Sequence, residues 1–421
     1  MEANHDEQVS RAAFLESKEN KFVSNHSSFP LLLVSMFLAM LGIGLVIPVL
    51  PQFLNEFGAG GQEAGLLVSC FGLTQFLFSP IAGNFADKYG RKPLIVLGLS
   101  LFSLSNFSAA LADDLMLLFV SRLIGGIGSA ALVPSIMAYA ADITTNEQRT
   151  KAMSYIGASM SSGFIIGPGV GGLLAEFGMR TPFFASACIG VLAMIGSMVL
   201  LPESLSLEHR LTRQQSRDKK PNVFLQLALS IKSRLFVLLF LVFALTFGLT
   251  HFDAIYPLYV VQSYGFTSRD IAILFTLCSL MGTFNQIMLT TRLIRRFGEK
   301  KTINYTLLLS SISFVLLLLS GNFWYVMFIT MLFFTCNNIL RPTINTLLSK
   351  RAGEEQGFVA GMNNAYMSLG NIFGPLLAGI LFDVHIHLPY LFGALVLLTA
   401  HFVSVKWIER KETVTGIAMN E

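Results

Sequence analysis

The chain has 421 residues, of which 53% are hydrophobic and only 13% are charged. Soluble globular domains carry about 25% charged residues, so this chain has too few charges to cover a surface in water. A soluble enzyme and a nucleic-acid-binding protein are therefore both disfavoured. The net charge of +4 is not enough to favour nucleic-acid binding. The four cysteines have neither disulfide-framework nor metal-site spacing.

The dominant pattern is a series of apolar stretches, each long enough to cross a bilayer as a helix of about 20 residues. In chain order they are 29–50, 64–85, 93–111, 116–140, 152–175, 182–202, 235–260, 269–291, 302–320, 323–347, 357–381 and 388–407. Strands of a membrane β-barrel would be shorter and would alternate apolar with polar residues. We therefore predict an all-α integral membrane protein with twelve transmembrane helices.

A long polar and basic segment divides these stretches into two sets of six. The predicted organisation is a tail (1–28), a six-helix bundle (29–202), a linker (203–234), a second six-helix bundle (235–407) and a C-terminal tail (408–421). Residues 1–28 carry charges of both signs and no apolar core, unlike a secretory signal.

The basic residues predict the orientation in the membrane. Lys and Arg gather in the tails, the linker and the even-numbered loops; Arg180 and Arg269 are in the other loops, and Arg122 and Arg341 are within spans. The positive-inside rule then places both termini in the cytoplasm of a multi-pass cell-membrane protein.

The two halves resemble each other at a nearly constant offset of 207 or 208 residues. The matched landmarks are Gly58 with Gly265, Gly90 with Gly298, Pro134 with Pro342, Gly167 with Gly374, and Pro168 with Pro375. This register indicates an internal duplication. Parallel six-helix repeats place the substrate site at their interface near the bilayer midplane, where one half rocks against the other.

The loop after the second span reads GNFADKYGRK over residues 83–92. It resembles the signature cytoplasmic loop of the major facilitator superfamily, with Phe85 where Leu is usual. The resemblance implies that fold in two six-helix repeats and a conformational latch, to which we add Asp142 as the partner of Arg91. The latch residues are Gly83, Asp87, Gly90, Arg91, Lys92 and Asp142. The alternative is an ordinary basic loop.

Spans four and five carry two further motifs. Arg122, followed by Gly126 and Ala130, is similar to a motif of proton antiporters in this superfamily. Residues 163–172 resemble the antiporter hinge motif, with an echo in span eleven; the hinge residues are Gly163, Gly167, Pro168, Gly171, Gly172, Gly374 and Pro375. The alternatives are an interfacial Arg122 and a purely packing role for the glycines.

Asp253 is the one acidic residue in the interior of a predicted span, since Asp270 lies at the very start of one. Related multidrug exporters carry an acid here before an aromatic run, and burial in an apolar cavity favours the neutral, protonated carboxyl group. The resemblance therefore makes Asp253 the leading proton-coupling residue, with Arg122 and His251 as further candidates. The alternative places Asp253 at the outer rim.

Polar residues within spans usually face the bundle interior. On this basis we predict substrate-binding residues in several spans, although each could instead bond a neighbouring helix; they are Gln75, Gln286, Asn337, Asn338, Arg341, Asn364 and Tyr256.

The sequence has no phosphate-binding loop, zinc-protease motif or nucleophile elbow, so we expect neither an enzyme nor a cofactor or metal site. We predict a monomeric, proton-coupled exporter of small amphipathic or hydrophobic compounds such as drugs, whose partners are that substrate, protons and the lipid bilayer, with no nucleic acid. The alternatives are an exporter of an endogenous solute and, with less support, a membrane sensor that does not transport.

Overall fold

The structure is a computed structural model that describes residues 28–204, 223–233, 235–352 and 356–417. The described residues form helices joined by short loops, with no strand among them. The predicted all-α membrane class is therefore confirmed. Much of the predicted linker and both chain ends lie outside the described residues, so the domain boundaries stay predictions.

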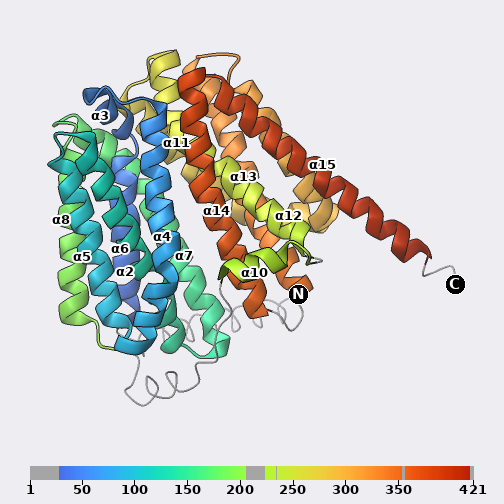
Figure 1. Cartoon of the computed structure of the whole chain (residues 1–421), viewed down its shortest axis with the longest axis horizontal. Coiled ribbons are helices and arrows are strands. Elements are labelled where there is room, and N and C mark those ends of the chain that lie inside the picture. The colour runs from blue at the N-terminus through green and yellow to red at the C-terminus, as the bar shows by residue number, and fades with distance from the viewer. Residues whose placement is uncertain (1–27, 205–222, 234, 353–355, 418–421) are drawn as a thin grey trace, which may run out of the picture.

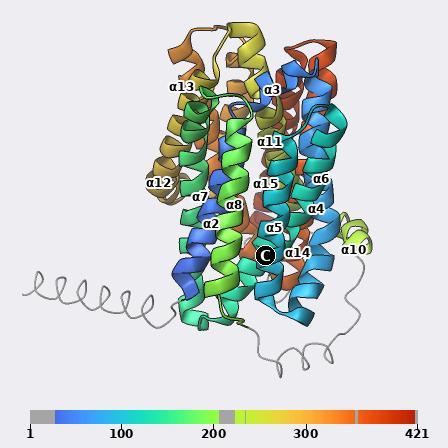
Figure 2. The same ribbon diagram turned by 90° about the vertical axis from the view of Figure 1, so that its left-hand side faces the viewer.

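The N-terminal half forms one group of helices, coloured blue to green in Figure 1. Its helices are α2 (Ser28–Val46), α3 (Leu50–Glu56), α4 (Gly61–Tyr89), α5 (Arg91–Ala110), α6 (Leu115–Asp142), α7 (Asn146–Ala175) and α8 (Thr181–Leu200). Figure 2 looks onto this half and shows its long helices running side by side between two loop-bearing ends.

The C-terminal half, coloured yellow to red, lies beside the first (Figure 1). Its helices are α10 (Val223–Ser230), α11 (Phe236–Tyr264), α12 (Ser268–Leu316), α13 (Phe323–Ala352), α14 (Gln356–Val384) and α15 (Leu388–Ile417). Helix α10 lies within the predicted linker, and α15 extends past the predicted boundary at residue 407.

Ten helices in the described part of the chain are long and apolar enough to cross a membrane. Helix α12 is not among them. It has 49 residues and is broken at Gly298, whose φ of 75° and ψ of 166° are not helical. The predicted spans 269–291 and 302–320 fall on either side of this break, so the count of twelve depends on reading α12 as two spans.

The backbone confirms the internal repeat. Gly58 and Gly265, matched at an offset of 207, have φ values of 64° and 69°. Gly90 and Gly298, matched at 208, have φ values of 110° and 75°. These conformations favour glycine because a Cβ would be strained there. The repeat therefore preserves backbone geometry at both ends of the bundles.

The two halves contact each other at the end that carries α3, which we call the α3 end. There, a Cβ on Gly65 of α4 would collide with the Pro375 carbonyl of α14, and one on Gly172 of α7 would collide with Ala272 of α12. Toward the opposite end, which we call the Arg91 end, Gly83, Gly157 and Gly361 have no such neighbour within 4 Å. Helices α4 and α14 diverge in this direction (Figure 1).

Candidate functional site

A cavity of about 510 Å³ lies between the two halves. Helices α2 to α7 of one half and α11 to α14 of the other contribute its lining. Most of the lining side chains are apolar and include several flexible or aromatic ones, such as Met40, Phe71, Phe164, Phe275 and Phe334. Such a lining fits apolar ligands of varied shape, because thioethers and aromatic rings adapt to irregular surfaces.

Two charged side chains of opposite sign reach this cavity from opposite halves. Arg122 comes from α6 and Asp253 from α11. The Nη2 atom of Arg122 and the Oδ1 atom of Asp253 are both buried without a hydrogen-bond partner among the described residues. This position contradicts the alternatives that placed Arg122 at the interface and Asp253 at the outer rim. Buried polar atoms are normally paired, so these two atoms are available to a ligand, a proton or water.

Polar uncharged residues complete the lining. Gln75 lines the cavity, and its Nε2 atom donates to Ser129 Oγ at 3.0 Å. Ser129 and Asn106, which were not predicted as cavity residues, also line the cavity. Their signal in the sequence is only a polar side chain within an apolar span, which does not tell a cavity-facing residue from one that bonds its own helix.

Two predicted site residues lie in the core of the C-terminal half. Tyr256 is fully buried, stacks on Phe252 with ring centroids 4.6 Å apart, and its hydroxyl bonds Thr330 Oγ1 at 2.9 Å. His251 is also fully buried; its Nδ1 is 3.0 Å from the Gly374 carbonyl and its Nε2 is 2.8 Å from the Pro389 carbonyl. Neither side chain reaches the cavity in this structure, so the roles of Tyr256 in substrate binding and of His251 in proton transfer stay predictions.

Four of the remaining predicted substrate residues, whose side chains the structure describes, are also absent from the lining of this cavity. Asn337 is buried, and its Nδ2 donates to the Phe333 carbonyl of its own helix. Asn338 packs on Gly282, and Asn364 is exposed. Arg341 is exposed. The side chain of Gln286 lies outside the described residues.

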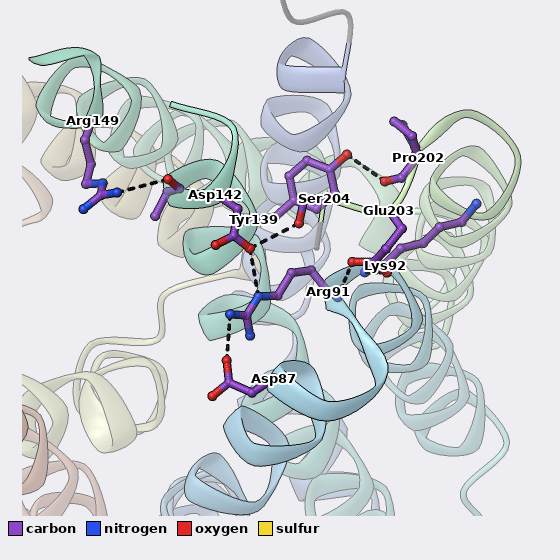
Figure 3. A network of polar contacts seen from close by, with 10 residues as sticks. Asp87, Arg91, Lys92, Tyr139, Asp142, Arg149, Pro202, Glu203 and Ser204 are labelled. Carbon is purple, nitrogen blue, oxygen red and sulfur yellow. Dashed lines mark hydrogen bonds and ion pairs between the residues drawn. The ribbon is translucent and has the colours of Figure 1, made fainter. Parts of the chain in front are cut away.

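The predicted latch residues form a network at the Arg91 end (Figure 3). The Arg91 side chain is 5% exposed; its Nη2 lies 2.7 Å from Asp87 Oδ1 and its Nε lies 3.1 Å from Asp142 Oδ2. The structure thus places Asp142 in contact with Arg91, as the sequence predicts. Among the described residues, the ion pairs of Arg91 join α4, α5 and α6 of one half.

Glu203, just beyond α8, is a member of the network that the latch prediction omitted. Its carboxylate accepts from the backbone N–H groups of Arg91 at 2.8 Å and Lys92 at 3.2 Å. It therefore caps the start of α5, where unpaired N–H groups favour an anion. The sequence feature that could have indicated Glu203 is its position as an acidic residue directly after the sixth predicted span.

Two latch glycines differ in their roles. Gly90 makes the turn between α4 and α5 with φ 110° and ψ 167°. Gly83 lies inside α4, and a Cβ there would meet nothing within 4 Å. Gly83 therefore makes neither a turn nor a close helix contact in this conformation.

The hinge glycines of α7 pack against α2. A Cβ on Gly163 would lie 2.6 Å from the Phe37 carbonyl oxygen, one on Gly167 would lie 2.7 Å from Gly44 Cα, and one on Gly171 would collide with the Leu45 carbonyl. Pro168 lies inside α7 and lines the cavity.

The C-terminal half repeats this arrangement between α14 and α11. A Cβ on Gly374 would lie 2.5 Å from Thr250 Oγ1, and Pro375 lies inside α14. The packing role that the sequence left open for these glycines is thus present in both halves.

Two duplicated helical bundles with a central cavity between them, in contact at one end, define a membrane transporter of the alternating-access class. The sequence profile of the Major Facilitator Superfamily matches residues 32–370 and 286–418. The chain belongs to the major facilitator superfamily.

The relatives with high sequence similarity are named for drug resistance. The chain is 41% identical to Multidrug resistance protein 2 of Bacillus subtilis (strain 168) over 390 residues, which cover 92% of this chain and 97% of the relative. It is 38% identical to the Quinolone resistance protein NorA of Staphylococcus aureus (strain COL), over 84% of this chain and 90% of the relative.

Among solved structures, a bacterial homologue of the human lysosomal transporter Spinster, in an inward-facing and occupied conformation, superposes with a TM-score of 0.75. It covers 92% of this chain and 97% of the other at 14% identity, so the likeness shows the fold alone.

Proposed function

We propose that this protein is a proton-coupled exporter of small amphipathic or hydrophobic compounds, including drugs. The cavity carries the proposal: it lies between two bundles that meet at one end, and it combines an apolar, aromatic lining with one carboxyl group. The names of the relatives support drugs as substrates.

In this proposal the protein works as a multi-pass transporter of the cell membrane, with both termini in the cytoplasm. The Arg91 end is then the cytoplasmic end, and the contacts at the α3 end describe a state closed toward the outside. Substrate enters the cavity from the cytoplasm or the inner leaflet. The chain acts as a monomer, because both bundles that form the cavity come from one polypeptide. It acts as a transporter rather than an enzyme.

Asp253 is the proton carrier of the proposal. Its Oδ1 is buried and unpartnered, so binding a proton there relieves an uncompensated polar atom in apolar surroundings. A cationic substrate group would satisfy the same carboxylate, so proton and substrate compete for it. Arg122 faces the same cavity and favours release of the proton through its positive charge.

The test is transport by the purified protein in liposomes. The protein would be reconstituted with an imposed pH gradient, and movement of a cationic amphipathic dye and of protons would be followed together. We expect dye movement that collapses when an ionophore removes the gradient. Dye movement that is indifferent to the gradient would contradict proton coupling. No dye movement, with gradient-driven flux of a metabolite, would favour export of an endogenous solute.

A further inference from the structure

The end of α14 carries a contact between the two halves that no motif predicts. Asp383 lies in the last turn of α14, and its carboxylate reaches the start of α4 in the other half. Its Oδ1 accepts from the Gly61 N–H at 2.7 Å and its Oδ2 accepts from the Gln62 N–H at 3.0 Å. We propose that Asp383 is a positioning residue for transport, a clamp that holds the α3 end closed.

The chemistry of the contact favours a strong clamp. The first N–H groups of a helix have no partner within the helix, and the helix dipole makes this end attractive to an anion. A carboxylate that accepts from two such groups forms charge-assisted hydrogen bonds, which are stronger than neutral ones. Because donor and acceptor belong to different halves, both bonds must break before the α3 end can open.

The backbone approach around the clamp explains why glycines begin α4. A Cβ on Gly60 would lie 2.9 Å from Asp383 Oδ1, and one on Gly61 would lie 2.5 Å from Phe382 Cδ1. Larger residues would therefore push the end of α14 away from the N–H groups. Nearby, Ser268 Oγ of α12 donates to Gln52 Oε1 of α3 at 2.6 Å, so a second hydrogen bond joins the halves at the same end.

The internal repeat shows that the clamp is one-sided. The residue that matches Asp383 at the offset of 207 is Glu176, which follows α7 and is exposed. The matching helix start, that of α12, is capped by its own N-terminal side chain, because Thr267 Oγ1 accepts from the Asp270 N–H at 3.2 Å. Only the interface of α4 with α14 thus carries a carboxylate from the other half in the described part of the chain.

The experiment measures the opening of the α3 end directly. Spin labels on Asn55→Cys in α3 and Arg269→Cys in α12, both exposed positions, report the distance between the halves in the full-length, otherwise cysteine-free protein in lipid nanodiscs. We expect Asp383→Asn to raise the ratio of separated to close label pairs about tenfold, the change that losing one charge-assisted hydrogen bond produces. Asp383→Glu keeps the charge and should raise the ratio less.

Glu63→Gln is the matched control. Glu63 Oε2 accepts from the Gly60 N–H at 2.7 Å at the same helix start, but within its own half. Removing this charge should leave the label distances unchanged. An unchanged distribution in Asp383→Asn, or an equal shift in Glu63→Gln, would overturn the clamp. The inference rests on the proposed transport function, but the label distances are measured without substrate. A protein that exports no dye but shows the expected label distances would therefore contradict the proposed function and not the clamp.

Discussion

Arg91 Nε lies 3.1 Å from Asp142 Oδ2, and both side chains are largely shielded from water, at 5% and 12% exposure. The second partner of Arg91, Asp87, is 48% exposed. Removing one member of a buried ion pair costs about 3–5 kcal/mol, whereas exposed pairs contribute about 0–1 kcal/mol. We therefore infer that, of the two carboxylates that pair with Arg91, Asp142 contributes more to the stability of the protein than Asp87 does.

The first prediction compares these two carboxylates. We expect Asp142→Asn to lower the free energy of unfolding by about 3 kcal/mol, the lower end of the buried range, because the pair lies at the bundle end. We expect Asp87→Asn to lower it by less than about 1 kcal/mol. Denaturant unfolding in detergent measures both, and equal losses would show that burial does not distinguish the two pairs.

The second prediction concerns the turn between α4 and α5. Gly90→Ala places a Cβ at φ 110°, a conformation that costs a non-glycine residue about 1–3 kcal/mol. Gly83→Ala is its control, because that site is helical and open, and alanine favours a helix by about 0.8–1 kcal/mol over glycine. We expect the unfolding temperature of Gly83→Ala to equal or exceed that of the unchanged protein, and that of Gly90→Ala to be lower. The reverse order would contradict this account of the motif.

The third prediction tests the packing of α7 on α2. Gly171→Ala brings a methyl group against the Leu45 carbonyl, and such overpacking costs about 1–3 kcal/mol. Gly157→Ala, on the same helix, meets nothing within 4 Å and should be tolerated. Transport rate and unfolding temperature should both fall for Gly171→Ala alone. A Gly171→Ala variant with normal stability and rate would show that α2 and α7 can separate without loss.

The fourth prediction addresses proton coupling. Asp253→Asn removes the only carboxyl group among the cavity-lining side chains, so the protons released on substrate binding should disappear while the apolar lining still binds dye. Asp113→Asn is the control, since Asp113 pairs with Arg180 at the surface, with its own side chain 88% exposed. Isothermal titration in two buffers of different ionisation enthalpy measures proton release. Release that survives Asp253→Asn would remove Asp253 from the coupling step.

The sequence by itself determined the membrane class, the duplication and the motif network. Length and apolarity define spans because a bilayer has a fixed thickness. Two of the matched glycine pairs, Gly58 with Gly265 and Gly90 with Gly298, mark positive-φ turns because few other residues adopt that backbone conformation. The partnership of Arg91 with Asp142 was predicted by adding the acid at the end of the fourth span to a loop that resembles a known signature.

Only the tertiary structure decided which polar side chains face the cavity. Asp253 reaches it, whereas Tyr256, three residues later on α11, is buried in an aromatic core. In a membrane, the lipid-facing and core-facing sides of a helix are both apolar, so hydrophobicity does not reveal how the helix is rotated. The contact of Asp383 with α4 was likewise hidden, because it joins residues more than 300 positions apart and depends on how the two bundles meet.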